Sequence, residues 1–246
     1  DVFNPGMTVR DHLLFYARIK GMPIEKERAQ VEGALNAIGL GGAWADKDAG
    51  TLSGGMKRRL TLGISFIGNP SVVFLDEPTT GLDPETRRAV WRLIERARNG
   101  RTIVLTTHAM DEADALAKRI GIMANGKLQC LGTSLHLKRK FGSGFKVEVD
   151  YDALRADTDR VREFVLSVVP EANLKEDYMG KMTFVVDRTK LVVSALFEAM
   201  TTRPDDLGIT AWALRQSSLE EVFLRIAMEA EAAGTADALG AEAART

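Results

Sequence analysis

The feature that most constrains the fold is a series of short apolar segments that alternate with helical ones after about residue 70. The apolar segments are 72–75, 103–105 and 120–123, and helical patterns lie between them near 84–98 and 111–118. Strands that alternate with helices predict a parallel α/β sheet. Because 72–75 is continuously apolar, we expect that strand to be buried on both faces. Residues 1 to about 70 show helical periodicity, which predicts a helical subdomain before an α/β core over about 71–143.

A different pattern begins near residue 144. Alternating apolar positions predict a half-buried strand over 145–151, and helical stripes at 161–168 and 193–200 flank a hairpin whose turn lies at 178–181. With a last strand at 209–214, this order predicts a separate α+β, ferredoxin-like domain over 144–230. Ser218 and Glu221 fit a capping box that starts a final helix, and the Ala-rich tail 231–246 is expected to fray.

Three polar residues follow predicted strands at their carboxyl ends, where α/β sheets place their ligand sites. Asp76 and Glu77 end the first strand, and His108 follows the second. An aspartate there can hold Mg²⁺ through water, and an adjacent glutamate can orient and deprotonate an attacking water. The alternatives are that the two acids cap a turn or helix, and that His108 is a partly buried residue whose hydrogen bonds are satisfied.

Ser53, Gly54 and Gly55 directly precede a predicted helix. Glycines allow a close backbone approach, and a helix start presents free N–H groups to an anion. The serine adds a hydroxyl donor. The alternative is a plain N-cap followed by a glycine turn. The position of this segment upstream of Asp76 strengthens the functional interpretation.

No segment matches a P-loop, Gly-x-x-x-x-Gly-Lys-Ser/Thr, whose backbone cradles phosphates. Residues 121–128 come near, but Leu128 stands where a hydroxyl should bind Mg²⁺. Asn125 and Gly126 between two apolar stretches predict a β-hairpin instead. The chain opens at Asp1 without a methionine, so we expect further sequence upstream in the natural protein.

Composition excludes several function classes. Hydrophobic residues make up 45% of the chain and charged residues 27%, as in an ordinary globular protein. A formal net charge of −1 gives no electrostatic reason to expect nucleic acid as a partner. The single cysteine, Cys130, excludes an internal disulfide framework. No apolar run approaches the roughly 18 residues of a membrane span.

The ordered motifs, taken together, resemble the downstream half of an ABC-type ATPase, the nucleotide-binding domain of ABC transporters. Within that superfamily the chain looks most like the A subfamily, whose best-known members export lipids. The segments that carry this resemblance are Leu-Ser-Gly-Gly-Met-Lys-Arg-Arg at 52–59, Thr-His-Ala-Met-Asp-Glu-Ala-Asp at 107–114, Gly-Lys-Leu-Gln-Cys-Leu-Gly at 126–132 and Leu-Glu-Glu-Val-Phe at 219–223. The resemblance extends to about residue 230.

The resemblance implies roles for the matching residues. The signature residues 53–55 would contact the γ-phosphate of an ATP held by a second nucleotide-binding domain. Asp76 would be the Walker-B aspartate that holds Mg²⁺, Glu77 the catalytic base and His108 the switch histidine. Asp83 would be the D-loop residue at the dimer seam. The P-loop, the adenine-stacking aromatic and the Q-loop glutamine are not found in the chain, so we expect it to be inactive alone.

The resemblance also implies partners and a place in the cell. The partners would be a second nucleotide-binding domain and the transmembrane domains of the same transporter. The transmembrane domains would dock on residues 3–10. The protein would work at the cytosolic face of a membrane and export lipid or another hydrophobic substrate, and residues 144–230 would be a regulatory domain. Two alternatives stay open: a soluble ABC ATPase that acts outside transport, and a non-hydrolysing module that lends its signature face to a partner.

Overall fold

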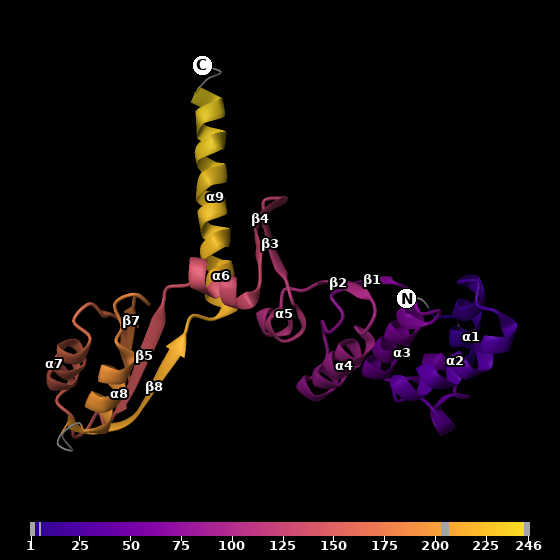
Figure 1. Cartoon of the computed structure of the whole chain (residues 1–246), viewed down its shortest axis with the longest axis horizontal. Helices are drawn as coiled ribbons and strands as arrows, with labels where there is room; N and C mark the ends of the chain where they lie inside the picture. Colours follow the sequence, from indigo (N-terminus) through magenta and orange to yellow (C-terminus); the bar gives the residue numbers. More distant parts are fainter. Residues whose placement is uncertain (1–2, 5, 203–206, 244–246) are drawn as a thin grey trace. The chain divides into compact units, whose positions relative to one another are not determined.

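The structure, a computed structural model, describes residues 3–4, 6–202 and 207–243. Contacts divide the chain into two compact units, residues 1–116 and 117–246, whose elements are labelled in Figure 1. The first unit contains α1 (Val9–Ile19), α2 (Ile24–Ala37), two 3₁₀ turns, η1 (Gly42–Trp44) and η2 (Ala49–Thr51), then α3 (Gly54–Phe66), β1 (Val72–Asp76), α4 (Pro84–Ala97), β2 (Thr102–Thr106) and α5 (Met110–Leu116).

Local chemistry explains where the helices of the first unit begin. Thr8 and Asp11 form a capping box at α1, in which each side chain bonds the backbone N–H of the other residue. Asp83 caps α4, and Pro84 occupies its first turn, where a missing N–H costs nothing. The helices bury a common apolar core, which includes the fully buried Leu13, Leu35 and Leu60 on α1, α2 and α3. These three helices therefore pack around one core.

β1 and β2 form a two-stranded parallel sheet in which Asp76 is the register partner of Thr106. Residues of β1 alternate between buried and exposed, and Phe74 is 75% exposed. The expectation that 72–75 is buried on both faces is wrong for this chain. Of the residues of β1, only Val73 and Leu75 belong to the apolar core of the unit. The described residues therefore cover one face of this strand.

The second unit begins with a hairpin and ends with a long helix. Its elements are β3 (Ile120–Ala124), β4 (Lys127–Gly132), α6 (Ser134–Phe141), β5 (Phe145–Tyr151), α7 (Thr158–Val168), β6 (Asn173–Tyr178), β7 (Lys181–Val186), α8 (Val193–Thr201), β8 (Ile209–Gln216) and α9 (Leu219–Ala243). β3 pairs antiparallel with β4 through the expected Asn125-Gly126 turn. The described strands therefore place 120–123 in a separate sheet, which corrects the expectation of a third strand beside β1 and β2.

β5 to β8 form a four-stranded sheet in the order β6-β7-β5-β8, in which every hydrogen-bonded pair is antiparallel. With α7 after β5 and α8 after β7, the chain follows the strand–helix–strand–strand–helix–strand order expected from the sequence. Alternate residues of the sheet, such as Val147 and Phe184, are fully buried and share one apolar cluster with Val165 of α7 and Leu196 of α8. This cluster is separate from the core of the first unit.

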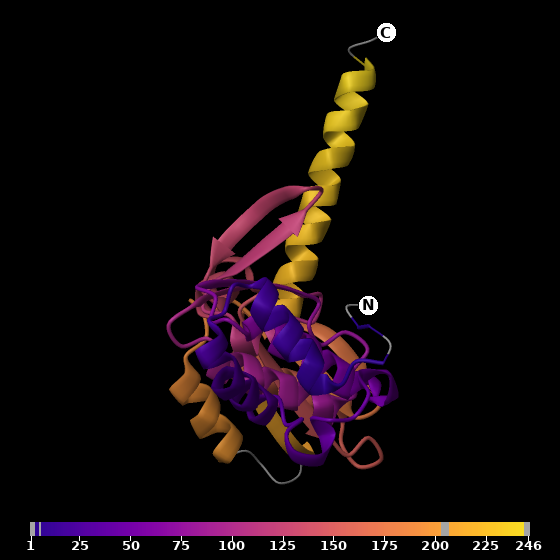
Figure 2. The same ribbon diagram turned by 90° about the vertical axis from the view of Figure 1, so that its right-hand side faces the viewer.

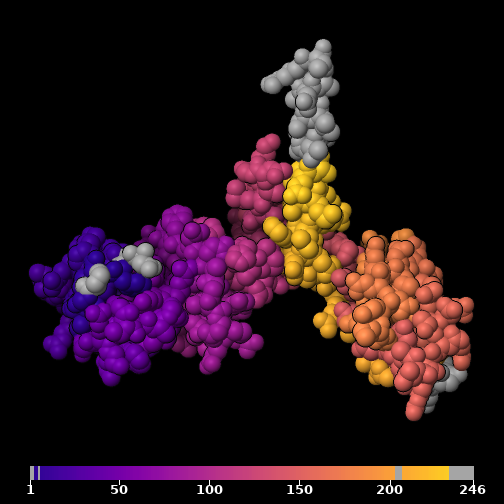
Figure 3. Space-filling model, turned by 180° about the vertical axis from the view of Figure 1, so that it is seen from behind, coloured from indigo at the N-terminus to yellow at the C-terminus, as the bar shows by residue number. Residues whose placement is uncertain are grey.

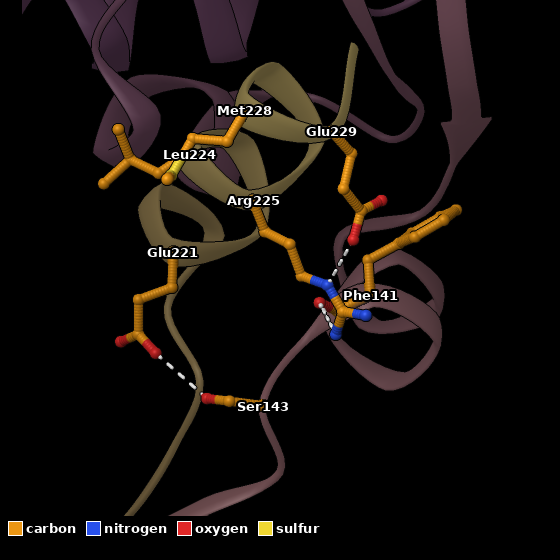
Figure 4. A pocket seen from close by; sticks show the side chains of 7 residues that line it. All are labelled: Phe141, Ser143, Glu221, Leu224, Arg225, Met228 and Glu229. Carbon is orange, nitrogen blue, oxygen red and sulfur yellow. Dashed lines mark hydrogen bonds and ion pairs between the residues drawn. The ribbon is translucent and has the colours of Figure 1, made fainter. Parts of the chain in front are cut away.

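The first turns of α9 pack on α6 and on β3, and Figures 2 and 3 show α9 beside the hairpin. The capping box is present, since Glu221 N–H bonds Ser218 Oγ at 3.1 Å and Ser218 N–H bonds Glu221 Oε1 at 3.4 Å. Arg225 bonds the carbonyl oxygen of Phe141 at 3.3 Å and pairs with Glu229 at 2.8 Å (Figure 4). These contacts link α9 to α6, so the second compact unit begins at residue 117, and the four-stranded sheet with its apolar cluster occupies 145–216 within it.

Two further findings concern helices. The helix α9 continues to Ala243, whereas the sequence predicted fraying from residue 231; alanine and glutamate have high helix propensity, which favours the longer helix. Residues 244–246 of that predicted tail lie outside the described residues. Among the helices that the structure describes, none combines the length and apolar character needed to cross a membrane.

Candidate active site

The carboxyl ends of β1 and β2 bring Asp76 and the segment after β2 side by side. Parallel pairing places Asp76 opposite Thr106, and the hydroxyl of Thr106 donates a hydrogen bond to Asp76 Oδ1. Asp76 is exposed to solvent. Its side chain therefore lies at the edge of the sheet where the sequence predicted a site, fixed by one hydrogen bond and open to a ligand.

Glu77 and His108 contact each other directly. His108 Nδ1 lies 2.8 Å from Glu77 Oε2, and the hydroxyl of Thr80 donates to the same oxygen at 2.6 Å. Because a carboxylate only accepts hydrogen bonds, His108 Nδ1 carries the proton in this contact. The side chains of His108 and Glu77 are 74% and 36% exposed, so the pair is accessible to water and to a ligand.

Two features fix the state and geometry of Glu77. The hydrogen bond from Thr80, followed by that from His108, holds the pKa of the Glu77 carboxyl below its usual value, so this group is ionised at neutral pH. The backbone of Glu77 has a φ of 47°, in the left-handed region that non-glycine residues rarely adopt. Such conformations persist only where the surrounding structure holds them, and they concentrate at functional sites.

The signature residues begin α3. Ser53 is its N-cap, and Ser53 Oγ accepts a hydrogen bond from Met56 N–H at 3.3 Å. Ser53 is therefore an N-cap residue. Its hydroxyl accepts one hydrogen bond in this role and can still donate its own hydrogen to a ligand. Gly54 is exposed, and a Cβ at this position would meet nothing within 4 Å. A Cβ on Gly55 would lie only 2.8 Å from Thr86 Cγ2, so a side chain at position 55 would require the Thr86 side chain to move.

Asp83 lies at the start of α4. Its Oδ1 accepts hydrogen bonds from the backbone N–H groups of Glu85 and Thr86, at 3.1 and 3.0 Å. A hydrogen bond from the Thr86 side chain, followed by the bond from its backbone N–H, holds the pKa of the Asp83 carboxyl below its usual value. The structure thus gives this residue a capping role, and it places the residue on the same helix turn that touches Gly55.

The structure brings the seven predicted residues into two groups. Asp76, Glu77 and His108 lie together at the sheet edge, and the signature residues lie with Asp83 where α3 and α4 begin. Sequence reasoning missed the side chains that support the first group, namely Arg58, Thr80 and Thr106. Arg58 lies within the signature segment, and no sequence signal indicates which carbonyl oxygens it reaches.

Among the described residues, no three His, Cys, Asp or Glu side chains are grouped so that they could hold a metal ion. Asp76 offers one exposed carboxylate. This fits Mg²⁺, which binds proteins through one or two carboxylates and completes its shell with water and substrate phosphates.

Comparison with known proteins gives matches across nearly the whole chain. The chain is 42% identical over 243 residues to ABC transporter A family member 11 of Arabidopsis thaliana, a match that covers 94% of this chain and 25% of the relative. It is 39% identical over 226 residues to ABC transporter A family member 7 of Dictyostelium discoideum, with 92% and 27% covered. It is 40% identical over 227 residues to the human phospholipid-transporting ATPase ABCA3, with 92% and 13% covered. The chain thus spans about a quarter or less of these relatives.

Two other comparisons gave matches to parts of the chain. A family model for an AAA domain, described with the AbiEii toxin of the Type IV TA system, matches residues 46–111, a segment that contains all seven predicted site residues. A solved dimer of an ATP-binding cassette bound to ADP and Pi in a post-hydrolysis state matches with a TM-score of 0.47 and 24% identity, covering 53% of this chain and 58% of that chain.

Proposed function

We propose that this chain, which belongs to the A family of ABC transporters, forms part of the ATP-hydrolysing motor of a membrane transporter. The observation that carries the proposal is the contact of Glu77 with His108 at 2.8 Å, at the carboxyl ends of two parallel strands. An ionised carboxylate held by a histidine and a threonine is suited to orient a water molecule. The alternative that these acids only cap a turn does not account for the direct contact of Glu77 with His108 across the two strand ends.

Each site residue then has a chemical task. ATP and Mg²⁺, when bound, supply the phosphoryl group and neutralise its developing charge. Asp76, whose Oδ1 accepts a hydrogen bond from Thr106, would hold the ion. Glu77 accepts a hydrogen bond from the attacking water and takes its proton, and His108 fixes the orientation of Glu77. His108 is largely exposed, which leaves its ring accessible to the γ-phosphate.

The signature residues and Asp83 serve a second nucleotide-binding domain in this proposal. The start of α3 offers backbone N–H groups, the Ser53 hydroxyl and no side chain at Gly54, which together suit a phosphate. The 246 residues contain no P-loop. In this proposal, residues outside these 246 hold the phosphates in the chain's own site.

The proposal extends to the complete transporter. One relative is named a phospholipid-transporting ATPase, and we propose that the complete protein moves lipid or another hydrophobic substrate through its own transmembrane domains, with this chain at the cytosolic face. A non-hydrolysing module would need the signature face but would not need the Glu77–His108 contact, so the contact favours the catalytic proposal. A soluble ABC ATPase is the second candidate, and it predicts hydrolysis that does not depend on transmembrane domains.

We also propose that residues 144–230 form a ferredoxin-like regulatory domain. Two observations support this proposal. The strands pair in the order β6-β7-β5-β8, and residues of α7 and α8 pack with this sheet in an apolar cluster separate from that of the first unit. Deleting the domain from the complete protein should leave ATP chemistry in place and alter its coupling to transport. Loss of nucleotide binding after the deletion would contradict a regulatory role.

The main test compares two histidines in the complete transporter, reconstituted in lipid vesicles. We expect His108→Ala to reduce phosphate release about a hundredfold, the scale of losing one preorganised group at a transition state. His136→Ala is the matched control, because His136 is exposed and lies far along the chain on α6. Equal activity of the two variants would contradict the assignment of the site.

A further inference from the structure

One guanidinium supports the backbone of the catalytic segment. Arg58 Nε donates a hydrogen bond to the carbonyl oxygen of Pro78 at 2.6 Å, and its Nη2 donates to the carbonyl oxygens of Asp76, at 3.2 Å, and Glu77. The carbonyl groups of the left-handed residue and of its two neighbours therefore all accept hydrogen bonds from one side chain. Arg58 itself is partly buried on α3.

The supported segment needs such an anchor because of its conformation. Glu77 adopts a φ of 47°, and an L-residue pays free energy to stay there. On the other side, Glu77 N–H donates to the carbonyl oxygen of Thr106 at 3.1 Å. The segment is thus held by β2 through its N–H and by α3 through its carbonyl groups. Release of either anchor would let Glu77 rotate toward an ordinary backbone conformation and carry its carboxylate away from His108.

We propose that Arg58 is a positioning residue that ties the start of α3 to the backbone of Glu77, and so couples the signature loop to the catalytic base of the same chain. The proposal rests on the proposed function. Arg58 lies one turn beyond Ser53, Gly54 and Gly55 on the same helix. A movement of the signature loop, when it engages a partner's nucleotide, would pass through this rigid turn to Glu77. Occupancy of one ATP site would thereby adjust the base of the other.

The planar fork of an arginine is needed for this task. A guanidinium has five N–H donors in fixed geometry, which lets it reach three carbonyl oxygens at once, whereas a lysine ammonium is a compact point charge. The neighbouring Arg59 offers a matched control, because its Nη1 donates to a single carbonyl oxygen, that of Ile38, at 3.0 Å. Both arginines lie on α3, so they differ mainly in which backbone they hold.

The first experiment measures hydrogen exchange in the 246-residue chain by mass spectrometry. In Arg58→Gln, we expect backbone amides of 76–82 to exchange at least about tenfold faster than in the unchanged chain, because bonds from a charged donor are among the stronger ones. Arg59→Gln should leave this segment unchanged. Arg58→Lys should give an intermediate rate, and it serves in place of Arg58→Gln if that variant does not fold. Unchanged exchange in the Arg58 variants, or equal acceleration in Arg59→Gln, would overturn the proposal.

The second experiment separates positioning from general stability in the complete transporter. We expect Arg58→Gln to lower kcat at least about tenfold while the KM for ATP changes less than about threefold, with partial recovery in Arg58→Lys. A rise in KM with unchanged kcat would overturn the positioning role. Failure of the proposed function can be distinguished from failure of the Arg58 proposal. If the proposed function were wrong, His108→Ala would retain full activity, whatever the exchange rates of the Arg58 variants are.

Discussion

The replacement of Glu77 by glutamine tests the proposed chemistry most directly. The two side chains have nearly the same size, and the amide oxygen of glutamine can accept the bond that Thr80 now donates at 2.6 Å. The same amide oxygen, in the place of Oε2, can also accept the hydrogen bond from His108 Nδ1, which contacts that position at 2.8 Å. We therefore expect the backbone and the neighbouring contacts to survive, and only the proton acceptor to be lost.

The size of the effect follows from the environment of the carboxylate. Loss of a general base costs about 10²–10⁴-fold in rate, which corresponds to about 2.7–5.4 kcal/mol of barrier. Hydrogen bonds from Thr80 and His108 hold the pKa of Glu77 below its usual value, and a carboxylate with a lowered pKa is a weaker base. We therefore expect a loss near the lower end, about a hundredfold. ATP binding should persist, so a closed dimer bound to ATP should accumulate.

The assay is phosphate release by the complete transporter at saturating ATP and Mg²⁺, with nucleotide binding measured separately. Glu85→Gln is the matched control, because Glu85 is an exposed acid in the first turn of α4. We expect the control to hydrolyse ATP at the rate of the unchanged protein. A rate for Glu77→Gln within about threefold of that of the control would show that Glu77 does not act as the base.

Four further outcomes are expected. The chain alone should bind ATP weakly and release no phosphate; micromolar affinity with steady turnover would contradict its dependence on an external P-loop. Ser53→Arg or Gly54→Asp in the complete protein should damage hydrolysis at the partner's nucleotide more than binding in the chain's own site, and site-specific labelling that shows equal loss in both would exclude action across a dimer. Phe184→Ala should lower the unfolding free energy of the second unit by about 3–5 kcal/mol, read from urea denaturation, because the ring is fully buried; a cost below about 1 kcal/mol would mean that the ring is not in the core. Hydrogen bonds from Thr8 lower the pKa of Asp11, so its stabilising effect is present above the unfolded pKa and is lost as pH falls through the folded one. The midpoint difference between Asp11→Asn and the unchanged chain should thus shrink from pH 7 to pH 3, and a constant difference would rule out this charge effect.

Features that depend on nearby residues were predicted well from the sequence. The Asn125-Gly126 turn and the capping box at Ser218 both form as expected, because each depends on the conformational preferences of a few adjacent residues. The carboxyl ends of β1 and β2 also lie together as expected. This follows from parallel pairing alone, and it was enough to bring Glu77 close to His108.

Features that depend on distant partners were predicted poorly. The apolar run of β1 predicted burial on both faces, yet Phe74 is 75% exposed, because hydrophobicity does not indicate which segment supplies the cover. The packing of α6 shows the same dependence, because its Leu137 is fully buried in the second unit, where α6 packs against α9. The three bonds of Arg58 were equally hidden, since they join a side chain to a backbone about twenty positions away.

The close approach of Thr86 to Gly55 has a consequence for association. The Thr86 methyl group would lie 2.8 Å from any Cβ on Gly55, and the backbone of Thr86 is bonded to Asp83. The signature segment 53–55 and the segment that begins at Asp83, both proposed to meet a second nucleotide-binding domain, therefore already lie close together in this chain. A surface that is already ordered loses little conformational entropy when it docks, so more of its contact energy remains as affinity. A side chain at Gly55 would displace the Thr86 side chain from this contact, and we expect such a variant to slow dimer closure.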